Sequence, residues 1–457
     1  MNKPTSLPTQ GAPAVALSQL LDATALALQA VRAGQSGTVA LETTAAALRP
    51  GVQALLFQVL RHLGRAQALR RQLAPRNPPP RVDALLCTAL ALAWDPQAAP
   101  YAPFTLVNQA VEAAKRHPAT RAQASFVNAC LRRFLRERDT LVAATQGDEV
   151  AVWNHPAWWI QRLRRDHPDQ WQQILQANNA PAPMVLRISK SKSTPALYQQ
   201  ALEAINIEAM AVGPDGLALA RPVPVQQLPG FAEGVVSVQD AAAQMAAPLL
   251  LNGLDAAQPL RLLDACAAPG GKTAHLLEWA AALRAPWRVT ALEVDAARAE
   301  RIHDNLHRLG LSAQVLVADA AVPADWWQQA SSGEPFDAIL LDAPCTASGI
   351  VRRHPDVRWL RRESDVAQLA AQQSRLLAAL WPLLRPGGRL LYCTCSVFRA
   401  EGDGQIAAFL AHNTDARLLP SPGHLFPGRP DKRDGLRDNG PGEHDGFFYA
   451  LLHKAPA

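Results

Sequence analysis

Hydrophobic residues between about positions 15 and 145 recur in steps of three and four, the spacing that places them on one face of a helix. The prolines at 78–80 must separate two helices, because proline removes a backbone donor and restricts the residue before it. We therefore predict an all-helical domain at 15–145, preceded by a disordered, polar and proline-rich segment at 1–14. The clearest stripes are Leu17, Leu20, Leu21, Ala25 and Leu28, and then Val52, Leu55, Leu56, Val59, Leu60 and Leu63.

A mixed pattern follows the helical region. Residues 153–179 have helical spacing, 185–188 predict a short strand and 194–204 a further helix. Residues 205–239 alternate short apolar runs with glycine and proline, which is typical of short strands. The pattern predicts a small mixed α/β subdomain at 150–235.

Strand and helix patterns alternate in the remainder, 236–457. Short apolar runs of this kind are typical of buried parallel strands, and their alternation with helices predicts a doubly wound α/β sheet. Such sheets bind their ligands at the carboxyl ends of the strands. We expect 385–388, Arg-Pro-Gly-Gly, to form the turn before the last strand. The predicted strands are 260–263, 289–294, 315–318, 338–341 and 390–393, and the predicted helices are 273–282, 297–309 and 366–380.

The formal net charge of +6 and the pI near 9.2 favour a polyanionic partner. The six cysteines form no CxxC pair and no histidine cluster accompanies them, so neither a metal site nor a disulfide framework is expected. No stretch of the sequence has the pattern of a signal peptide or the length of a membrane span. We therefore expect a cytoplasmic protein with reduced thiols.

A glycine-rich segment, Asp264-Ala-Cys-Ala-Ala-Pro-Gly-Gly-Lys272, follows the first strand of this sheet. It lacks both the GxGxxG spacing of dinucleotide sites and the upstream glycine of a P-loop. Acids stand at the ends of the following strands: Glu293, with Asp295 as its rival, then Asp319 and Asp342. Carboxylates at these tips suit ribose hydroxyls and a cationic ligand, whereas they repel the phosphates of ATP. The pattern therefore favours S-adenosylmethionine.

Two cysteines, Cys345 and Cys395, each leave an apolar strand for a polar loop on the ligand side. A thiolate is a strong nucleophile, and its pKa falls near positive charge. The basic residues 352–354 are close enough in sequence to lower the pKa of Cys345. In contrast, Cys87, Cys130 and Cys393 lie within apolar helix or strand patterns and are expected to be buried structural residues.

These motifs together resemble a known family. The segment 264–272, Asp342-Ala-Pro-Cys345 and Thr394-Cys-Ser396 are similar to three signatures of the NOP/Sun RNA 5-methylcytosine methyltransferases, and Asp445-Gly-Phe-Phe-Tyr449 strengthens the match. Phe126-Val-Asn-Ala-Cys-Leu-Arg132 resembles the NusB-like RNA-binding domain fused to bacterial members. The resemblance implies a NusB-like domain at 15–145, a small α/β RNA-binding linking subdomain at 150–235, and a Rossmann-like class I methyltransferase domain at 236–457.

The resemblance also implies roles for individual residues. Cys395 would add to C6 of cytosine as the nucleophile, Cys345 would aid product release or remove a proton, and Asp342 would contact the base edge. Two departures stand out: Glu293 occupies a position where aspartate is more usual, and Val397-Phe-Arg-Ala-Glu401 lacks the Pro-Glu-Glu-Asn run often found there. The residues implied to bind S-adenosylmethionine are Cys266, Ala267, Ala268, Pro269, Gly270, Gly271, Lys272, Glu293, Asp319 and Asp342.

The implied substrate is 16S ribosomal RNA, free or in an early small-subunit particle, and the protein is expected to act as a monomer. A basic stripe with a stacking ring is the predicted RNA contact. Three alternatives remain: a DNA-type enzyme with Cys345 as nucleophile, a 5-methylcytosine enzyme for another RNA such as tRNA, and a non-catalytic assembly factor. The predicted contact stripe comprises Arg352, Arg353, His354, Arg358 and Trp359.

Overall fold

The computed structural model describes residues 15–428 and 443–456, so the predicted disorder of 1–14 lies outside the described residues. The described chain forms two compact units. The first contains the chain up to Ile160 together with His354–Leu360, and the second contains Gln161–Arg353 and everything from Arg361 onward. Within the described ranges, no helix combines the length and the apolar character needed to cross a membrane.

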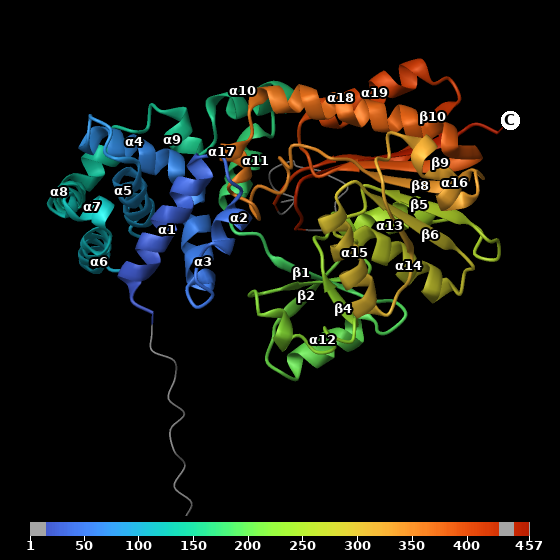
Figure 1. Cartoon of the computed structure of the whole chain (residues 1–457), viewed down its shortest axis with the longest axis horizontal. Helices are drawn as coiled ribbons and strands as arrows, with labels where there is room; N and C mark the ends of the chain where they lie inside the picture. Colours follow the sequence, from blue (N-terminus) through green and yellow to red (C-terminus); the bar gives the residue numbers. More distant parts are fainter. Residues whose placement is uncertain (1–14, 429–442, 457) are drawn as a thin grey trace, which may run out of the picture. The chain divides into compact units, whose positions relative to one another are not determined.

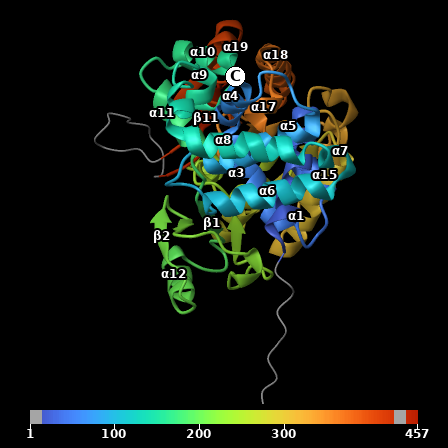
Figure 2. The ribbon, with the colours of Figure 1, turned by 90° about the vertical axis from the view of Figure 1, so that its left-hand side faces the viewer.

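The first unit is helical throughout, as predicted. Its helices are α1 (Leu17–Arg32), α2 (Gly37–Glu42), α3 (Arg49–Arg61), α4 (Leu63–Leu73), α5 (Pro80–Ala93), α6 (Pro103–Arg116), α7 (Pro118–Arg121), α8 (Ala124–Ala143), α9 (Glu149–Trp153), the start of α10 (Ala157–Asp166) and α17 (Val357–Leu360). Every residue of α5 from Ala84 to Leu92 is buried, which is typical of a central helix. Helices α1, α3, α4, α6 and α8 pack against it, and Figure 2 shows α6 and α8 side by side.

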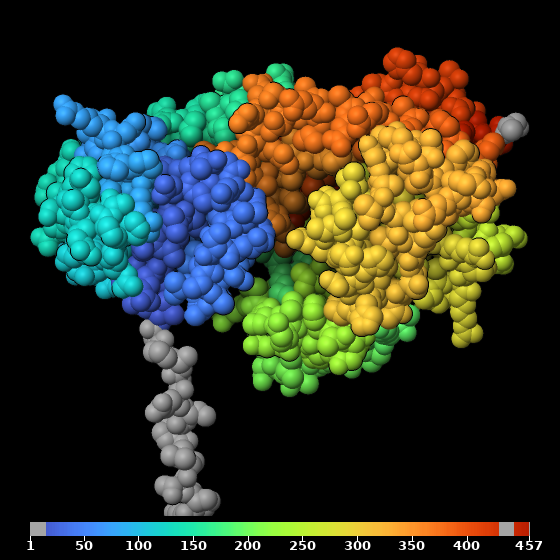
Figure 3. Space-filling view, in the orientation of Figure 1, coloured from blue at the N-terminus to red at the C-terminus, as the bar shows by residue number. Residues whose placement is uncertain are grey.

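The second unit begins with a small antiparallel sheet in the order β2-β3-β1-β4. Its elements are α11 (Trp171–Asn179), β1 (Met184–Ile188), α12 (Pro195–Glu203), β2 (Ala209–Val212), β3 (Gly216–Leu219) and β4 (Val236–Val238). Tyr198 and Leu202 of α12 cover one face of this sheet. Arg308 joins the sheet to the following domain by donating to the carbonyl oxygens of Phe231 and Val236. In Figure 3 the surface of this subdomain, in green, is accordingly continuous with the surface of the following domain, in yellow.

The larger sheet has seven strands in the order β10-β11-β9-β8-β5-β6-β7. Its elements are α13 (Ala246–Leu251), β5 (Arg261–Ala265), α14 (Gly271–Leu283), β6 (Arg288–Glu293), α15 (Ala296–Leu309), β7 (Gln314–Val317), α16 (Trp327–Ser331), β8 (Phe336–Asp342), α18 (Glu363–Leu380), β9 (Leu384–Thr394), α19 (Asp403–His412), β10 (Ala416–Leu425) and β11 (Phe447–Lys454). Strands β7, β6, β5, β8 and β9 are parallel, which confirms the predicted doubly wound core.

Helices cover both faces of this sheet. Successive strand residues point to opposite faces, so neighbouring residues of one strand pack against different groups of helices. In β8, Leu340 packs into the cluster that contains α13, α14 and α15, whereas Ile339 and Leu341 pack into the cluster that contains α18 and α19. Figure 1 shows these two groups of helices on opposite sides of the strands. Burial on both faces explains why the central strands appear in the sequence as continuous apolar runs.

Two features of the sheet differ from the prediction. The antiparallel strands β10 and β11 extend it beyond β9. Residues 385–388, expected to form a turn, instead lie within β9, where the register shifts between the pairs Phe336↔Leu384 and Ala338↔Arg389. Gly387 has a φ of 75°, a conformation open to glycine, so this segment bulges from the strand without ending it.

Candidate active site

The two predicted catalytic cysteines lie in contact. Strands β8 and β9 are parallel neighbours that pair Asp342 with Cys393, so the loops that leave them start at the same sheet edge. The Sγ atoms of Cys345 and Cys395 are 3.3 Å apart. Cys393, Cys87 and Cys130 are buried as expected. The structure therefore brings together the two thiols that the sequence distinguished from the others.

The electrostatic environment of Cys345 differs from the prediction. The hydrogen bond with Cys395 and then burial raise the pKa of the Cys345 thiol well above its ordinary value, and the nearby Glu401 charge acts in the same direction. Arg352 and Arg353, expected to lower it, instead pair with the buried carboxylate of Asp445. Cys345 is therefore held as a protonated thiol.

Asp342 and Lys272 form an ion pair beside the thiols. Lys272 Nζ lies 2.7 Å from Asp342 Oδ2, and the Cys393 thiol lies 3.5 Å from the other carboxylate oxygen. Burial alone would lower the pKa of Lys272, but the Asp342 carboxylate raises it above its usual range. The lysine is therefore charged, and its ammonium group lies 5.4 Å from the centre of the Phe447 ring.

The glycine-rich segment connects β5 to α14 through a tight turn. Cys266 and Gly270 have positive φ angles of 64° and 93°. A Cβ atom on Gly270 would lie 3.1 Å from Ile302 Cα of α15, so a larger residue would press against that helix. The Ala267 amide donates to Leu292 O of β6 at 2.8 Å. These contacts fix the turn at the carboxyl ends of β5 and β6, where a ligand of the sheet is expected.

The structure distinguishes Glu293 from Asp295. Glu293 is 2% exposed, and its carboxylate accepts from the amides of Ala268 at 3.3 Å and Asp295 at 3.1 Å. Asp295 is exposed and caps α15 by accepting from the Arg298 amide at 3.0 Å. The side chain facing the glycine-rich turn is therefore Glu293, whereas Asp295 has a helix-capping role.

Two further acids test the fit of a cationic, ribose-bearing cofactor. Asp264 is fully buried and accepts from Thr273 Oγ1 at 2.6 Å through Oδ2, and its Oδ1 has no hydrogen-bond partner among the described residues. Burial raises the pKa of Asp264 to about 7. The side chain of Asp319 is 44% exposed at the end of β7. An unpartnered carboxylate oxygen and accessible acids at the strand ends fit S-adenosylmethionine. Among the described residues, no group of three or more His, Cys, Asp or Glu side chains is arranged to hold a metal ion.

The predicted RNA-contact stripe requires correction. Arg352 is 1% exposed and pairs with Asp445, and Arg353 pairs with Asp445 and Asp240. Arg358 is fully buried within the first unit and donates to Asn154 O. Neither Arg352 nor Arg358 is available to RNA in this structure, because their charges meet carboxylate or carbonyl oxygens far away in the sequence.

The other two residues of the stripe differ from each other. Trp359 is half-buried and its indole N–H donates to Leu60 O at 2.9 Å, so one edge of the ring is occupied by protein. His354 is exposed. Only His354 presents an uncovered side chain from this segment.

Sequence reasoning missed the residues that join the two cysteine loops. Gly349 N donates to Cys395 O at 2.9 Å, and Val397 N donates to Ser348 Oγ at 2.9 Å. His167 bonds to Val397 O at 2.6 Å from the end of α10. The loop without the usual Pro-Glu-Glu-Asn run is therefore held in a defined shape. The residues that hold this loop are distant from it in sequence, so no local pattern predicts them. Glu401 is the exception, because it lies in the atypical run 397–401 that the sequence had already singled out.

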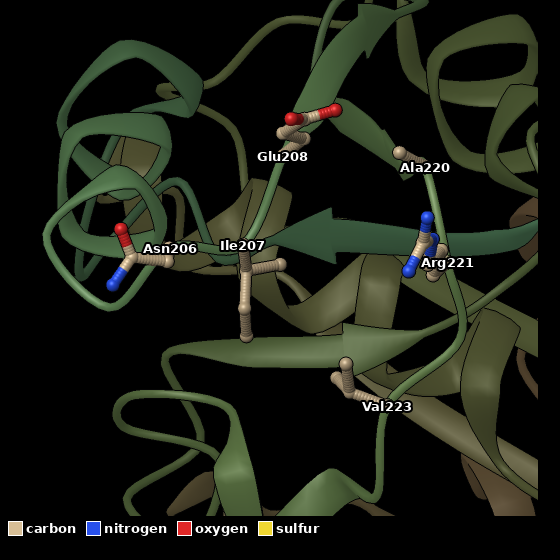
Figure 4. A pocket seen from close by; sticks show the side chains of 6 residues that line it. All are labelled: Asn206, Ile207, Glu208, Ala220, Arg221 and Val223. Atoms are coloured by element: carbon tan, nitrogen blue, oxygen red, sulfur yellow. The ribbon is translucent and has the colours of Figure 1, made fainter.

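A separate pocket lies on the small subdomain (Figure 4). It has a volume of about 310 Å³. Its lining has one acid, one base and no thiol, so it offers none of the chemistry gathered at the cysteines. The lining residues are Asn206, Ile207, Glu208, Ala220, Arg221 and Val223.

Three known families match successive parts of the chain. The NusB family matches residues 17–136, the ferredoxin-like domain of RsmF/B-like methyltransferases matches 155–226, and the 16S rRNA methyltransferase RsmB/F family matches 251–453. Fold and site thus define an S-adenosylmethionine-dependent methyltransferase with a NusB-like domain, in agreement with the predicted fold class and cofactor.

Individual relatives narrow this class. Ribosomal RNA small subunit methyltransferase B of Vibrio cholerae is 42% identical, over 93% of this chain and 95% of the relative. The protein of the same name from Pasteurella multocida is 41% identical over 89% of this chain and 88% of the relative. The chain belongs to the family of ribosomal RNA small subunit methyltransferases B.

Solved structures share the fold. The crystal structure of PH0851 matches with a TM-score of 0.73 at 24% identity, covering 99% of this chain and 100% of that one. A methyltransferase homologue from Pyrococcus horikoshii matches with a TM-score of 0.53 at 26% identity, covering 67% of this chain and 98% of that one. The fold of this chain is therefore found in other proteins of known structure.

Proposed function

We propose that this protein transfers a methyl group from S-adenosylmethionine to C5 of a cytosine in 16S ribosomal RNA through a covalent adduct with Cys395. The contact between the Cys345 and Cys395 thiols, 3.3 Å apart beside the Lys272–Asp342 ion pair, is the observation that carries the proposal. A single nucleophilic thiol would explain methyl transfer by addition, but a second thiol in contact suggests a separate role in completing the reaction.

The cofactor, when bound, supplies an activated methyl group. The turn at 266–272 would hold it together with Glu293, Asp319 and Asp342, and the Glu293 carboxylate would suit its ribose hydroxyls. In the part of the chain that the structure describes, Asp264 Oδ1 is buried without a partner, so it can accept a hydrogen bond from a cationic ligand. The acids at the strand ends therefore favour the positive charge that the cofactor carries.

The thiols and the ion pair account for activation of the base. The Cys395 thiolate adds to C6 of cytosine, forming a C–S bond and moving electron density to C5, which makes C5 nucleophilic. Asp342 contacts the base edge, and the Lys272 ammonium beside it stabilises the negative charge that develops on the ring. After methylation, a base takes the C5 proton, the C5–H electron pair reforms the C5–C6 double bond, and the C–S electron pair returns to Cys395 as the thiolate leaves. Cys345 touches the departing sulfur and serves that final stage.

The target base has to leave its stack to reach the thiols, at a cost of a few kcal/mol that is smallest in a loop. The net charge of +6 suits a polyanion. We assign RNA-binding roles to the helical NusB-like domain and to the small α/β subdomain, with His354 as a contact. The substrate is free 16S RNA or an early small-subunit particle, and the protein acts as a cytoplasmic monomer.

The test is methyl transfer from labelled S-adenosylmethionine to 16S ribosomal RNA by the wild type, Cys395→Ala and Cys345→Ala. We expect Cys395→Ala to be inactive and Cys345→Ala to accumulate a protein–RNA adduct that survives denaturing electrophoresis. Nuclease mapping of the labelled product should place the methyl group on cytosine.

Other outcomes select the alternatives. An inactive Cys345→Ala without an adduct, together with an active Cys395→Ala, would favour the chemistry of DNA cytosine methyltransferases. Transfer to tRNA in preference to 16S RNA would change the substrate. Failure to bind S-adenosylmethionine, measured by calorimetry, would favour a non-catalytic assembly factor.

A further inference from the structure

Glu401 is a fully buried carboxylate behind the two thiols. It ends the short 3-10 turn Arg399–Glu401 that follows β9. Its backbone carbonyl accepts from Tyr392 Oη at 2.9 Å and Thr394 Oγ1 at 3.2 Å, which fixes the turn against the end of the strand. A buried charge is costly unless it is well paired, so its partners indicate what it does.

The carboxylate joins the residues that follow each cysteine. Oε1 accepts from the Thr346 amide at 2.9 Å and from Gln373 Nε2 of α18 at 3.2 Å. Oε2 accepts from Ser396 Oγ at 2.6 Å and from the Thr346 hydroxyl. Thr346 is bonded to Cys345 and Ser396 to Cys395 in the chain. One side chain therefore links the backbones that carry both thiols.

The partners favour the ionised state. The Thr346 amide and the Gln373 side-chain amide can only donate, and the Thr346 and Ser396 hydroxyls can donate as well, so an ionised carboxylate can accept from all four groups. Burial raises the pKa of Glu401, while the hydrogen bonds from Ser396, Thr346 and Gln373 oppose that shift. Four donors around one group satisfy a negative charge, which then acts on the neighbouring thiols at low local dielectric.

Further contacts make the two loops one body. Ser396 Oγ lies 2.9 Å from Ser348 Oγ, and Gly349 N donates to Cys395 O. Arg361 Nε donates to Thr346 O at 3.1 Å from the opposite side. Glu401 is the only acid that bonds directly to residues of both loops in the described part of the chain. A substitution at Glu401 is therefore expected to alter the positions of both sulfur atoms.

We propose that Glu401 is a positioning residue that holds Cys345 and Cys395 in contact, and that its negative charge adds to the Cys395 hydrogen bond and to burial in keeping Cys345 protonated. The first part follows from the hydrogen bonds to Thr346 and Ser396. The second follows from a buried anion bonded to the residue next to Cys345. This inference rests on the proposed function and specifies how that site is organised.

The variants are Glu401→Gln, which removes the charge at nearly constant shape, Glu401→Asp, which keeps the charge on a shorter side chain, and Glu300→Gln as the matched control. Glu300 is exposed on α15. Each full-length protein is compared for melting temperature, S-adenosylmethionine affinity, and kcat and KM with 16S RNA. The rate of Cys345 alkylation by iodoacetamide is followed across pH by mass spectrometry.

For Glu401→Gln we expect kcat to fall by at least about tenfold, with KM for RNA and cofactor affinity within about threefold of wild type. The alkylation midpoint of Cys345 should move to lower pH because thiolate formation no longer faces a neighbouring anion. Glu401→Asp should restore the alkylation midpoint while kcat stays low, and Glu300→Gln should match wild type in every readout.

An unchanged kcat or an unchanged alkylation midpoint in Glu401→Gln overturns the proposal. If Glu401→Gln does not fold, Thr346→Val and Ser396→Ala replace it, since each removes one hydroxyl donor to the carboxylate. An unchanged kcat in both of these variants would also overturn the proposal. Alkylation needs no RNA. A wild type that fails to methylate 16S RNA therefore contradicts the proposed function and leaves the organisation of the thiols separately measurable.

Discussion

At the scale of single residues, the thiol site depends on a close contact between two glycines. Gly446 N donates to Gly349 O at 2.9 Å, and a Cβ atom on Gly349 would lie 2.0 Å from Gly446 O. No side-chain motion relieves an overlap between backbone atoms, so the loop after Cys345 would have to shift. Because Gly349 N also bonds to Cys395 O, that shift would separate the two thiol loops.

Gly349→Ala is therefore expected to lower kcat by at least about tenfold and to reduce the melting temperature, because misplacement of about 1 Å is enough to cost a large factor in rate. Methyl transfer and thermal unfolding check both effects. Gly147→Ala is the control, since no atom of the described residues lies within 4 Å of a Cβ atom placed there. Equal rates for the two variants would contradict the assigned contact.

A pH dependence of stability follows from Asp264, whose pKa is raised to about 7 by burial. The unfolded-state pKa of aspartate is near 3.9. Because the folded-state value is the higher one, the contribution of Asp264 to stability is fully present below about pH 4 and is lost as pH rises through 7. Asp264→Asn, which keeps an acceptor for Thr273, avoids this loss.

The difference in melting temperature between Asp264→Asn and wild type should therefore increase from pH 5 to pH 8 by several degrees, given about 2–4 °C per kcal/mol for a domain of this size. Melting curves without cofactor at the two pH values provide the measurement. Other titrating groups are common to both proteins and cancel in the difference. A difference that does not change with pH refutes the assignment.

At the scale of elements, a buried ion pair connects strand β1 to helix α14. Arg187 and Glu278 are 1% and 3% exposed and form two hydrogen bonds of 3.1 and 2.9 Å. Arg187 Nη1 also donates to Gly271 O at 2.8 Å, at the start of α14. The small subdomain thereby fixes the end of the glycine-rich turn, which explains why the two form one compact unit.

Arg187→Met should destabilise the second unit by about 3–5 kcal/mol, because it leaves Glu278 buried without its partner. The double variant Arg187→Met/Glu278→Leu should recover most of this loss. Urea unfolding measures both changes. Glu334→Gln, in an ion pair whose acid is 62% exposed, is the control and should change stability by less than about 1 kcal/mol. A double variant as unstable as the single one would contradict this account.

The sequence predicted elements well where a local pattern determines them. The central strands are apolar on both faces and stand out as continuous runs, and α15 begins at the capping residue Asp295. Strand β10 contains Pro420, Pro422 and Gly423 and shifts register between Leu419 and Gly423, so its pairing with β11 depends on tertiary context. Such a strand has no clear period for sequence reasoning to detect.

The candidate active site was likewise predictable only where a local sequence pattern determines it. Cys345 and Cys395 were identified because each directly follows a strand, and parallel strands end at a common edge. The partners of Arg352 and Glu401 lie 93 and 55 residues away, at Asp445 and Thr346. A basic run looks the same in sequence whether its charges face solvent or buried carboxylates. Only the folded structure separates these cases.

At the scale of the whole molecule, the chain path makes the helical unit depend on sequence from the second half. His354–Leu360 belongs to the first unit, although Arg353 before it and Arg361 after it belong to the second. Asp356 Oδ2 accepts from Gly37 N at 2.8 Å, and Trp359 Nε1 donates to Leu60 O at 2.9 Å. The helical unit is therefore completed by residues that lie between the two cysteines in the sequence.

Trp359→Ala should destabilise the helical unit by up to about 3 kcal/mol, since a half-buried indole and its hydrogen bond are both removed. In the full-length protein, amide hydrogen exchange should become faster in α3, which carries Leu60, and stay unchanged in β5 and β6. Trp327→Ala is the matched control, because its indole also donates to a backbone carbonyl, Glu334 O, but within the second unit. Its effect should be confined to peptides around α16. Unchanged exchange in α3 after the loss of Trp359 would show that the helical unit does not depend on this segment.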